Sequence, residues 1–165
     1  MDEVPLRPLD LLATLVAHGV EFVVIGGFSL AAHGYVRGTK DVDVVPDPSP
    51  ANLARLLSAL ADLEAEPLAV GDLDKNEVLE LTAENLQLGG NWLLRTRFGR
   101  LDVMQYVAGV GSYDAFRAGA VSLPGLDPSP PFAGYADLIT MKRVAGRDED
   151  LRDIAELERR RESGS

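Results

Sequence analysis

The stretch that decides the fold reads EFVVI (residues 21–25), GG (26–27), FSLAAHG (28–34) and, a few residues later, KDVDVV (40–45). An apolar run rich in β-branched residues is typical of a buried strand, and the glycine pair ends it. The residues after the glycines favour a short helix. Polar and apolar side chains then alternate, which predicts a second strand. These residues therefore predict a strand, a glycine turn, a short helix and a strand in close succession.

The rest of the chain alternates helical and extended patterns in the same way. Leucines at helical spacing predict the long helices, and Asn91–Phe98 with Arg100–Val107 predict a hairpin that turns at Gly99. This order indicates an α/β or α+β fold, with one domain over residues 1–162 and a tail at 163–165. The other expected elements are helices at 6–18, 51–63, 112–118, 135–145 and 148–161, the last a solvated helix, and a proline-rich loop at 124–131.

Composition limits the function classes. The chain has 165 residues, no cysteine, two histidines and a formal net charge of −10. Disulfide scaffolds, thiolate or histidine-rich metal sites and cysteine nucleophiles are therefore excluded. The negative charge disfavours bulk nucleic acid and anionic membranes as partners. No apolar run is long enough to span a bilayer, and residues 1–5 lack the features of a signal peptide, so we expect a cytoplasmic protein.

Carboxylates and glycines supply the candidate site. Asp41 and Asp43 lie two apart on a predicted strand, so both leave the same face, where they repel each other unless a cation such as Mg²⁺ lies between them. Taken alone, such a pair is more often a solvated strand end. Asp102, on the second arm of the predicted hairpin, is equally well an edge charge or a site residue. Gly26 and Gly27 precede a helix and would let phosphate approach the backbone, although a glycine pair is more often only a tight turn.

Together these segments resemble a known family. They are Gly26–Gly27, LAAHGY (residues 30–35), RGTKDVD (37–43) and the later strand with Asp102. The combination looks like the nucleotidyltransferase superfamily, and more narrowly like small bacterial nucleotidyltransferases related to the toxins of abortive-infection and toxin–antitoxin systems. The segment from Ala136 to Asp153 also resembles the C-terminal helices of these proteins. The resemblance implies the minimal nucleotidyltransferase fold, a short mixed β-sheet flanked by helices.

The resemblance also implies roles for individual residues. Asp41 and Asp43 would hold two Mg²⁺ ions, and Asp102 would complete one metal site and help to deprotonate the attacking hydroxyl. The implied reaction moves a nucleoside monophosphate from an NTP to a hydroxyl acceptor and releases pyrophosphate. The nucleotide would be bound by Gly26, Gly27, Ser29 and Lys142. One departure concerns Phe28, which stands where many relatives have the serine or threonine that touches a phosphate.

Several alternatives stay open. The acceptor would be a tRNA end, a protein or a small molecule such as an aminoglycoside, and a cognate partner protein would supply what a short chain lacks. A second hypothesis is a nucleotidyltransferase-like binding module without activity, which Phe28 favours. A third is a cation-binding domain of unrelated fold, in which Asp102 would lie far from Asp41 and Asp43.

Basic residues near these motifs have two interpretations each. Arg37 and Lys40 flank the acidic pair and would contact phosphate or substrate, or would belong to a solvated loop. Arg95, Arg97 and Arg100 form the most basic local stretch. They would guide an RNA or nucleotide acceptor, or, as the favoured interpretation, pair with acidic residues such as those at 62–84.

Overall fold

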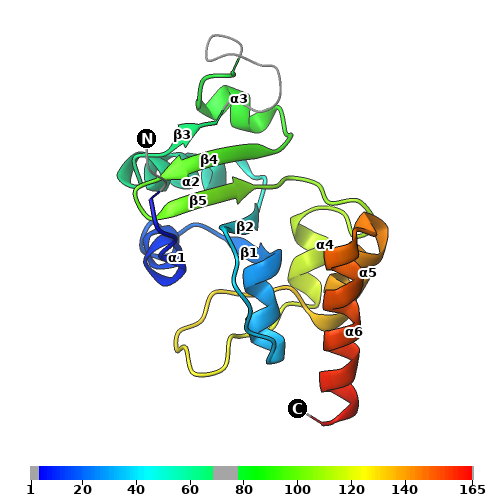
Figure 1. Cartoon of the computed structure of the whole chain (residues 1–165). Helices are drawn as coiled ribbons and strands as arrows, with labels where there is room; N and C mark the ends of the chain where they lie inside the picture. Colours follow the sequence, from blue (N-terminus) through cyan, green and yellow to red (C-terminus); the bar gives the residue numbers. More distant parts are fainter. Residues whose placement is uncertain (1–3, 69–77, 165) are drawn as a thin grey trace.

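A computed structural model describes residues 4–68 and 78–164 of the chain. Its elements agree closely with the expected helices and strands (Figure 1). The strands are β1 (Phe22–Ile25), β2 (Asp41–Pro46), β3 (Glu66–Pro67), β4 (Trp92–Thr96) and β5 (Gly99–Val103). The helices are α1 (Pro8–Ala17), the 3₁₀ helix η1 (Gly27–His33), α2 (Pro50–Asp62), α3 (Ala83–Gln87), α4 (Tyr113–Ala118), α5 (Tyr135–Ala145) and α6 (Asp148–Glu162).

The strands form one mixed sheet in the order β1-β2-β5-β4-β3. Strands β2 and β5 are parallel, and the other pairs are antiparallel. The register aligns Asp43 with Asp102, and Asp41 with Arg100. The expectation of a short mixed sheet flanked by helices is confirmed, and the parallel pair lies at its centre.

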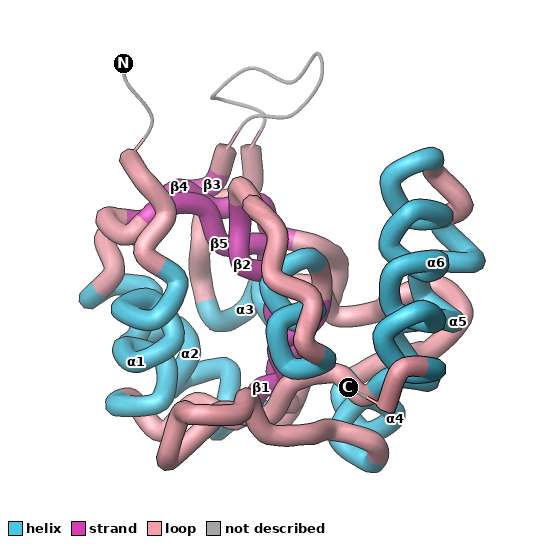
Figure 2. The backbone as a smooth tube through the Cα atoms, turned by 60° about the horizontal axis from the view of Figure 1, so that its bottom comes forward, coloured by secondary structure: helices cyan, strands magenta, loops and turns pink. Residues whose placement is uncertain are grey.

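The two faces of the sheet are covered differently (Figure 2). One face carries Val42, Val44, Leu101 and Val103, all fully buried in a core shared with α1 and α2. On the opposite face, Val23, Ile25 and Val45 of β1 and β2 form a second core with helices α4, α5 and α6. No β4 residue belongs to that second core. As far as residues 4–68 and 78–164 show, the β5–β4 half of this face is therefore open, and the polar side chains of β2 and β5 lie at the boundary between the covered and open halves.

The edge of β1 positions the C-terminal helices. The N–H of Val24 donates to Pro131 O at 2.9 Å, and the N–H of Ala133 donates to Val24 O at 2.8 Å. Helix α5 begins two residues later and packs against α6. Backbone pairing thus brings the segment from Ala136 to Asp153 beside the polar boundary of the sheet.

Four details differ from the expectations. The hairpin turns at Arg97 and Phe98, and Gly99 is already the first residue of β5, paired with Thr96. Its arms are also shorter than expected, because the chain leaves the ladder after Val103. The expected short helix after the glycines is present, but it begins one residue earlier, at Gly27, and is a 3₁₀ helix. The short β3 and α3 were not expected within the acidic stretch at 62–84, of which residues 69–77 lie outside the described residues.

Two further observations concern the surface of the molecule. Helix α6 is less solvated than its charge pattern predicts, since Asp150 and Asp153 are 2% and 1% exposed. Across the described residues, no helix is both long enough and apolar enough to cross a lipid bilayer.

Candidate active site

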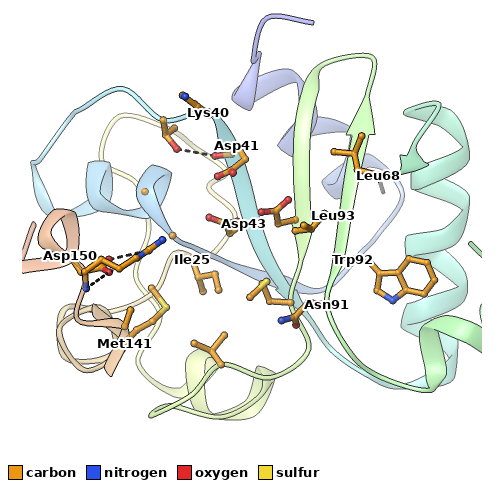
Figure 3. A pocket seen from close by; sticks show the side chains of 18 of the residues that line it. Ile25, Lys40, Asp41, Asp43, Leu68, Asn91, Trp92, Leu93, Met141 and Asp150 are labelled. Atoms are coloured by element: carbon orange, nitrogen blue, oxygen red, sulfur yellow. Dashed lines mark hydrogen bonds and ion pairs between the residues drawn. The ribbon is translucent and has the colours of Figure 1, made fainter. Parts of the chain in front are cut away.

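Three carboxylates converge at the boundary of the open sheet face (Figure 3). Asp41, Asp43 and Asp102 each offer an oxygen within 4.8 Å of the other two. The parallel register of β2 and β5 causes this convergence, because Asp43 and Asp102 are direct neighbours on one face. The hypothesis of an unrelated fold required Asp102 to lie far from the pair, and it is wrong.

The electrostatics of this carboxylate triad are those of a cation site. Burial, with repulsion from Asp41 and Asp102, raises the pKa of Asp43 to about 8. Burial and the Asp41 charge also raise the pKa of Asp102, although Asp43 and Arg100 act in the opposite direction. Within the described residues, Oδ1 of Asp102 is buried without a hydrogen-bond partner. Oxygen donors at this spacing, with one of them unsatisfied, fit a divalent cation such as Mg²⁺.

The glycine turn lies directly against the triad. Gly26 has φ +75° and ψ −161°, a conformation that is essentially restricted to glycine. A Cβ on Gly26 would lie 1.9 Å from Oδ2 of Asp43, so the close approach also requires glycine. Gly27 is less tightly packed, since its Cβ would lie 3.0 Å from Oγ1 of Thr39. Thr39 was not among the expected site residues, and nothing in the pattern of its neighbours singled it out.

Ser29 does not take the place that the resemblance gave it. Its side chain is fully buried, and its hydroxyl donates to Gly26 O at 2.5 Å. It is absent from the residues that line the cavity beside the triad. The adjacent Phe28 packs on the core and lies 5.8 Å, ring centre to ring centre, from Phe132. The serine hydroxyl therefore closes the turn rather than facing the cavity.

Lys142 reaches the site from α5. It is 5% exposed, and its Nζ lies 2.8 Å from Oδ2 of Asp153 and 3.5 Å from Oδ1 of Asp150. Its charge stabilises ionised Asp43. Lys142 thus lines the cavity, and two carboxylates hold it whose burial the charge pattern of α6 did not indicate.

Arg37 joins the same network from the loop before β2. Its Nε and Nη2 donate to the two oxygens of Asp153 at 3.0 and 2.9 Å, a bidentate pair that fixes the guanidinium. That guanidinium lies beside Gly27, whose Cβ would be 3.5 Å from Nη2. Lys40 is exposed and also lines the cavity. The site therefore has cations on the glycine side of the triad, with Arg37 and Lys142 held rigidly.

A cavity of about 1,100 Å³ is lined by the glycine turn, the carboxylate triad, Arg37, Lys40 and Lys142. Apolar side chains such as Leu68, Leu93 and Met104 also line it. Ligand pockets for drug-sized molecules are typically about 300–1,000 Å³. The cavity therefore has room for a nucleotide together with part of a second molecule.

No family model and no curated protein matches this sequence. Among solved structures, the fold is similar to that of the lincosamide antibiotic adenylyltransferase LnuA with lincomycin bound. The TM-score is 0.62 and the identity 16%, covering 95% of this chain and 98% of that chain. It is also similar to ANT(2″)-Ia in complex with adenylyl-2″-tobramycin, with a TM-score of 0.52 and 13% identity, covering 93% and 91% of the two chains. At these identities the likeness establishes a nucleotidyltransferase-like fold.

Proposed function

We propose that this protein is a metal-dependent nucleotidyltransferase that moves a nucleoside monophosphate from an NTP to a hydroxyl acceptor. The observation that carries the proposal is the convergence of Asp41, Asp43 and Asp102 beside the Gly26–Gly27 turn. It is supported by the likeness of the fold to LnuA and ANT(2″)-Ia, which are described as an adenylyltransferase and as bound to an adenylylated product.

The triad would hold the metal. Asp41 and Asp43 would be the principal ligands, and the unpartnered Oδ1 of Asp102 would complete the set. Bound divalent cations supply charge stabilisation at the attacking and leaving oxygens of a phosphoryl transfer. We propose Mg²⁺, as two ions, because carboxylate oxygens are the ligands it prefers.

The remaining groups would bind and orient the nucleotide. Backbone at Gly26 and Gly27 allows close approach of the triphosphate, and Arg37, Lys40 and Lys142 line the cavity on that side. The ion pairs with Asp150 and Asp153 fix Arg37 and Lys142 before the substrate arrives. Such preorganisation lowers the cost of positioning a charged substrate.

The proposed transfer forms one bond to the α-phosphorus of the NTP and breaks another. The acceptor oxygen forms a bond to the α-phosphorus, the bond from that phosphorus to the bridging oxygen breaks, and pyrophosphate leaves. The hydroxyl proton passes to a carboxylate oxygen of Asp102.

Calorimetric titration tests the proposal. Each NTP is titrated with Mg²⁺ and with EDTA into the wild type, the double variant Asp41→Asn/Asp43→Asn and the control Asp10→Asn. Asp10 is an exposed partner of Arg7 on α1, on the other side of the sheet. We expect Mg²⁺-dependent binding to the wild type and control, and none to the double variant. Release of pyrophosphate with a hydroxyl acceptor then tests transfer.

The second candidate is a nucleotidyltransferase-like module that binds a partner without catalysis. The position of Ser29 favours it, because the hydroxyl is bonded to Gly26 O and turned from the cavity. A folded wild type that binds no NTP with Mg²⁺ would support this candidate over the enzyme. A place in a toxin–antitoxin pair, with a cognate partner protein, belongs to the same proposal. Its direct test is rescue, by a co-expressed neighbouring gene product, of growth that this chain inhibits.

A further inference from the structure

Two arginines stand side by side on the open half of the sheet face. Arg100 of β5 is the direct neighbour of Asp41 on one side and of Arg95 of β4 on the other. Residues directly opposite across a sheet project from the same face. Arg95 and Arg100 therefore extend the row that begins at Asp41, beside the row of Asp43, Asp102 and Leu93.

Neither arginine forms an ion pair within the described residues, although the charge of Arg100 favours the ionised form of Asp102. No carboxylate in the described ranges lies within ion-pair distance of Arg95 or Arg100, and the buried Nε of Arg100 has no hydrogen-bond partner there. The register places the exposed Glu66 opposite Arg95, but the two form no ion pair. Arg95 and Arg100 stand directly opposite each other, and two like charges in this position destabilise a sheet.

Arg97, in the turn after β4, behaves differently. Its Nη2 lies 3.5 Å from Oδ1 of Asp62, and its Nε donates to Asp62 O at 3.1 Å. The expectation that these arginines pair with nearby acids is therefore confirmed for Arg97. It is wrong for Arg95 and Arg100 within the part of the chain that the structure describes.

A small cavity lies at the two arginines. Its volume is about 60 Å³, and Arg95, Arg100, Gly99, Val4 and Leu68 line it. Leu68 also lines the large cavity that holds the triad, so the two spaces are neighbours. Neither arginine lines the large cavity itself, so a molecule bound at the arginines would have to extend past Leu68 to reach the triad.

We propose that Arg95 and Arg100 bind a phosphate group of the acceptor. The proposal rests on the proposed nucleotidyltransferase function and names the class of its second substrate, a hydroxyl compound that carries phosphate. Strand order separates the two phosphate sites. The glycine turn, Arg37 and Lys142 lie on the β1 and α5 side of the triad, and the arginine pair lies on the β5–β4 side. Paired guanidinium groups match phosphate oxygens through several parallel N–H donors.

The test measures the two phosphate sites separately. The wild type is first saturated with Mg²⁺ and a non-hydrolysable NTP analogue, then titrated with glucose 6-phosphate, with glucose and with a short RNA that has a free 3′ hydroxyl. The same titrations use Arg95→Gln, Arg100→Lys and the matched control Arg97→Gln. Binding of the phosphate-bearing probes without the NTP analogue is measured as well, so that the arginine site is read even if no NTP binds.

We expect the phosphate-bearing probes to bind the wild type and Arg97→Gln alike, and glucose to bind neither measurably. Binding should weaken about tenfold or more in Arg95→Gln, since a hydrogen bond to a charged group contributes about 1.5–3 kcal/mol. Arg100→Lys should weaken it less. The affinity for the NTP analogue should be unchanged in Arg95→Gln. Preference for glucose 6-phosphate over RNA, or the reverse, identifies the source of the phosphate.

Three results would overturn the proposal. One is equal loss of probe binding in Arg95→Gln and Arg97→Gln. Another is probe binding by the wild type that Arg95→Gln leaves intact. The third is weaker NTP binding in Arg95→Gln, which would assign the arginines to the nucleotide. Failure of the wild type to bind any NTP would instead contradict the proposed function, and probe binding to the free protein would still decide the arginine site.

Discussion

Gly26 and Asp43 are in such close contact that residue 26 cannot carry a side chain unless the Asp43 carboxylate moves. A Cβ at residue 26 would lie 1.9 Å from Oδ2 and 2.8 Å from Cγ of Asp43. The carboxylate of Asp43 therefore packs against the backbone of the turn, and the turn fixes the position of one ligand of the proposed metal site.

Gly26→Ala should disrupt both stability and metal binding. The positive φ with extended ψ costs about 1–3 kcal/mol for a residue with a Cβ, and the carboxylate of Asp43 must also move. We expect a lower free energy of unfolding by about that amount and weaker Mg²⁺ binding, measured by urea titration and calorimetry. Gly38→Ala is the control, because no atom lies within 4 Å of its added Cβ. Equal effects of the two substitutions would contradict this account.

Asp43→Asn should stabilise the metal-free protein. Burial and repulsion raise the pKa of this carboxyl to about 8, so its ionised form is unfavourable in the folded state near neutral pH. We expect the midpoint of thermal unfolding in EDTA to rise by about 2–4 °C, as about 1 kcal/mol would produce in a chain of this size.

With Mg²⁺ the wild type should instead have a higher midpoint of thermal unfolding than Asp43→Asn. Mg²⁺ stabilises the wild type by binding the folded state, and the variant lacks a ligand. Thermal unfolding with and without Mg²⁺ measures both effects, with Asp10→Asn as the control. An Asp43→Asn protein that is less stable than the wild type in EDTA would refute the prediction.

Lys142→Met should destabilise the protein and weaken NTP binding. The substitution leaves Asp150 and Asp153 buried, with Arg147 and Arg37 as their remaining partners. Removing one partner of a buried ion pair costs about 3–5 kcal/mol, and we expect the lower end because those arginines remain. Urea unfolding gives the stability, and calorimetry gives the NTP affinity. Lys142→Arg keeps the charge and should retain most of both.

Lowering the pH should remove the contribution of Asp153 to the free energy of unfolding. Burial opposes its ionisation, but hydrogen bonds from Arg37 and Lys142 outweigh burial and lower its pKa. A carboxyl with a lowered folded-state pKa contributes stability above its unfolded pKa of about 3.9, and this contribution disappears as the pH falls through the folded value.

The matched measurement is urea unfolding of the wild type and Asp153→Asn, in EDTA, from pH 7 to pH 2. The difference in unfolding free energy between the wild type and Asp153→Asn should be largest at neutral pH and should shrink below about pH 4. Asp148→Asn, an exposed change on the same helix, should show no such trend. A difference that is constant down to pH 2 would contradict the role given to Asp153.

The alternation at 40–45 explains why the carboxylate pair could be located from sequence. A period of two is a local property, so it places Asp41 and Asp43 on one face without knowledge of the fold. Asp102 required the parallel register of β2 and β5, which comes from a strand far along the chain. Only the family resemblance supplied that relation in advance.

The surroundings of Ser29, Asp150 and Asp153 could not be predicted, because they depend on the tertiary structure rather than on a local pattern. In the sequence, Ser29 places a hydroxyl next to the glycine turn. In the structure Ser29 belongs to the 3₁₀ helix η1, and its hydroxyl donates to Gly26 O. The Arg37–Asp153 pair joins residues 116 positions apart, so the charge pattern of α6 could indicate only its local i,i+4 pairs. Burial of Asp150 and Asp153 is decided by α5 and the loop before β2, which a helical pattern does not contain.

Parallel pairing at the centre of the sheet also determines when the site comes into being during folding. The β1–β2 hairpin is local and brings together only Gly26, Asp41 and Asp43. Asp102 arrives after the chain has passed through α2, β3, α3 and β4 and inserted β5 beside β2. Closing such a long loop is slow compared with local pairing. The complete carboxylate triad is thus a property of the finished topology. If the triad binds Mg²⁺ as proposed, tight binding would report that the last central strand is in place.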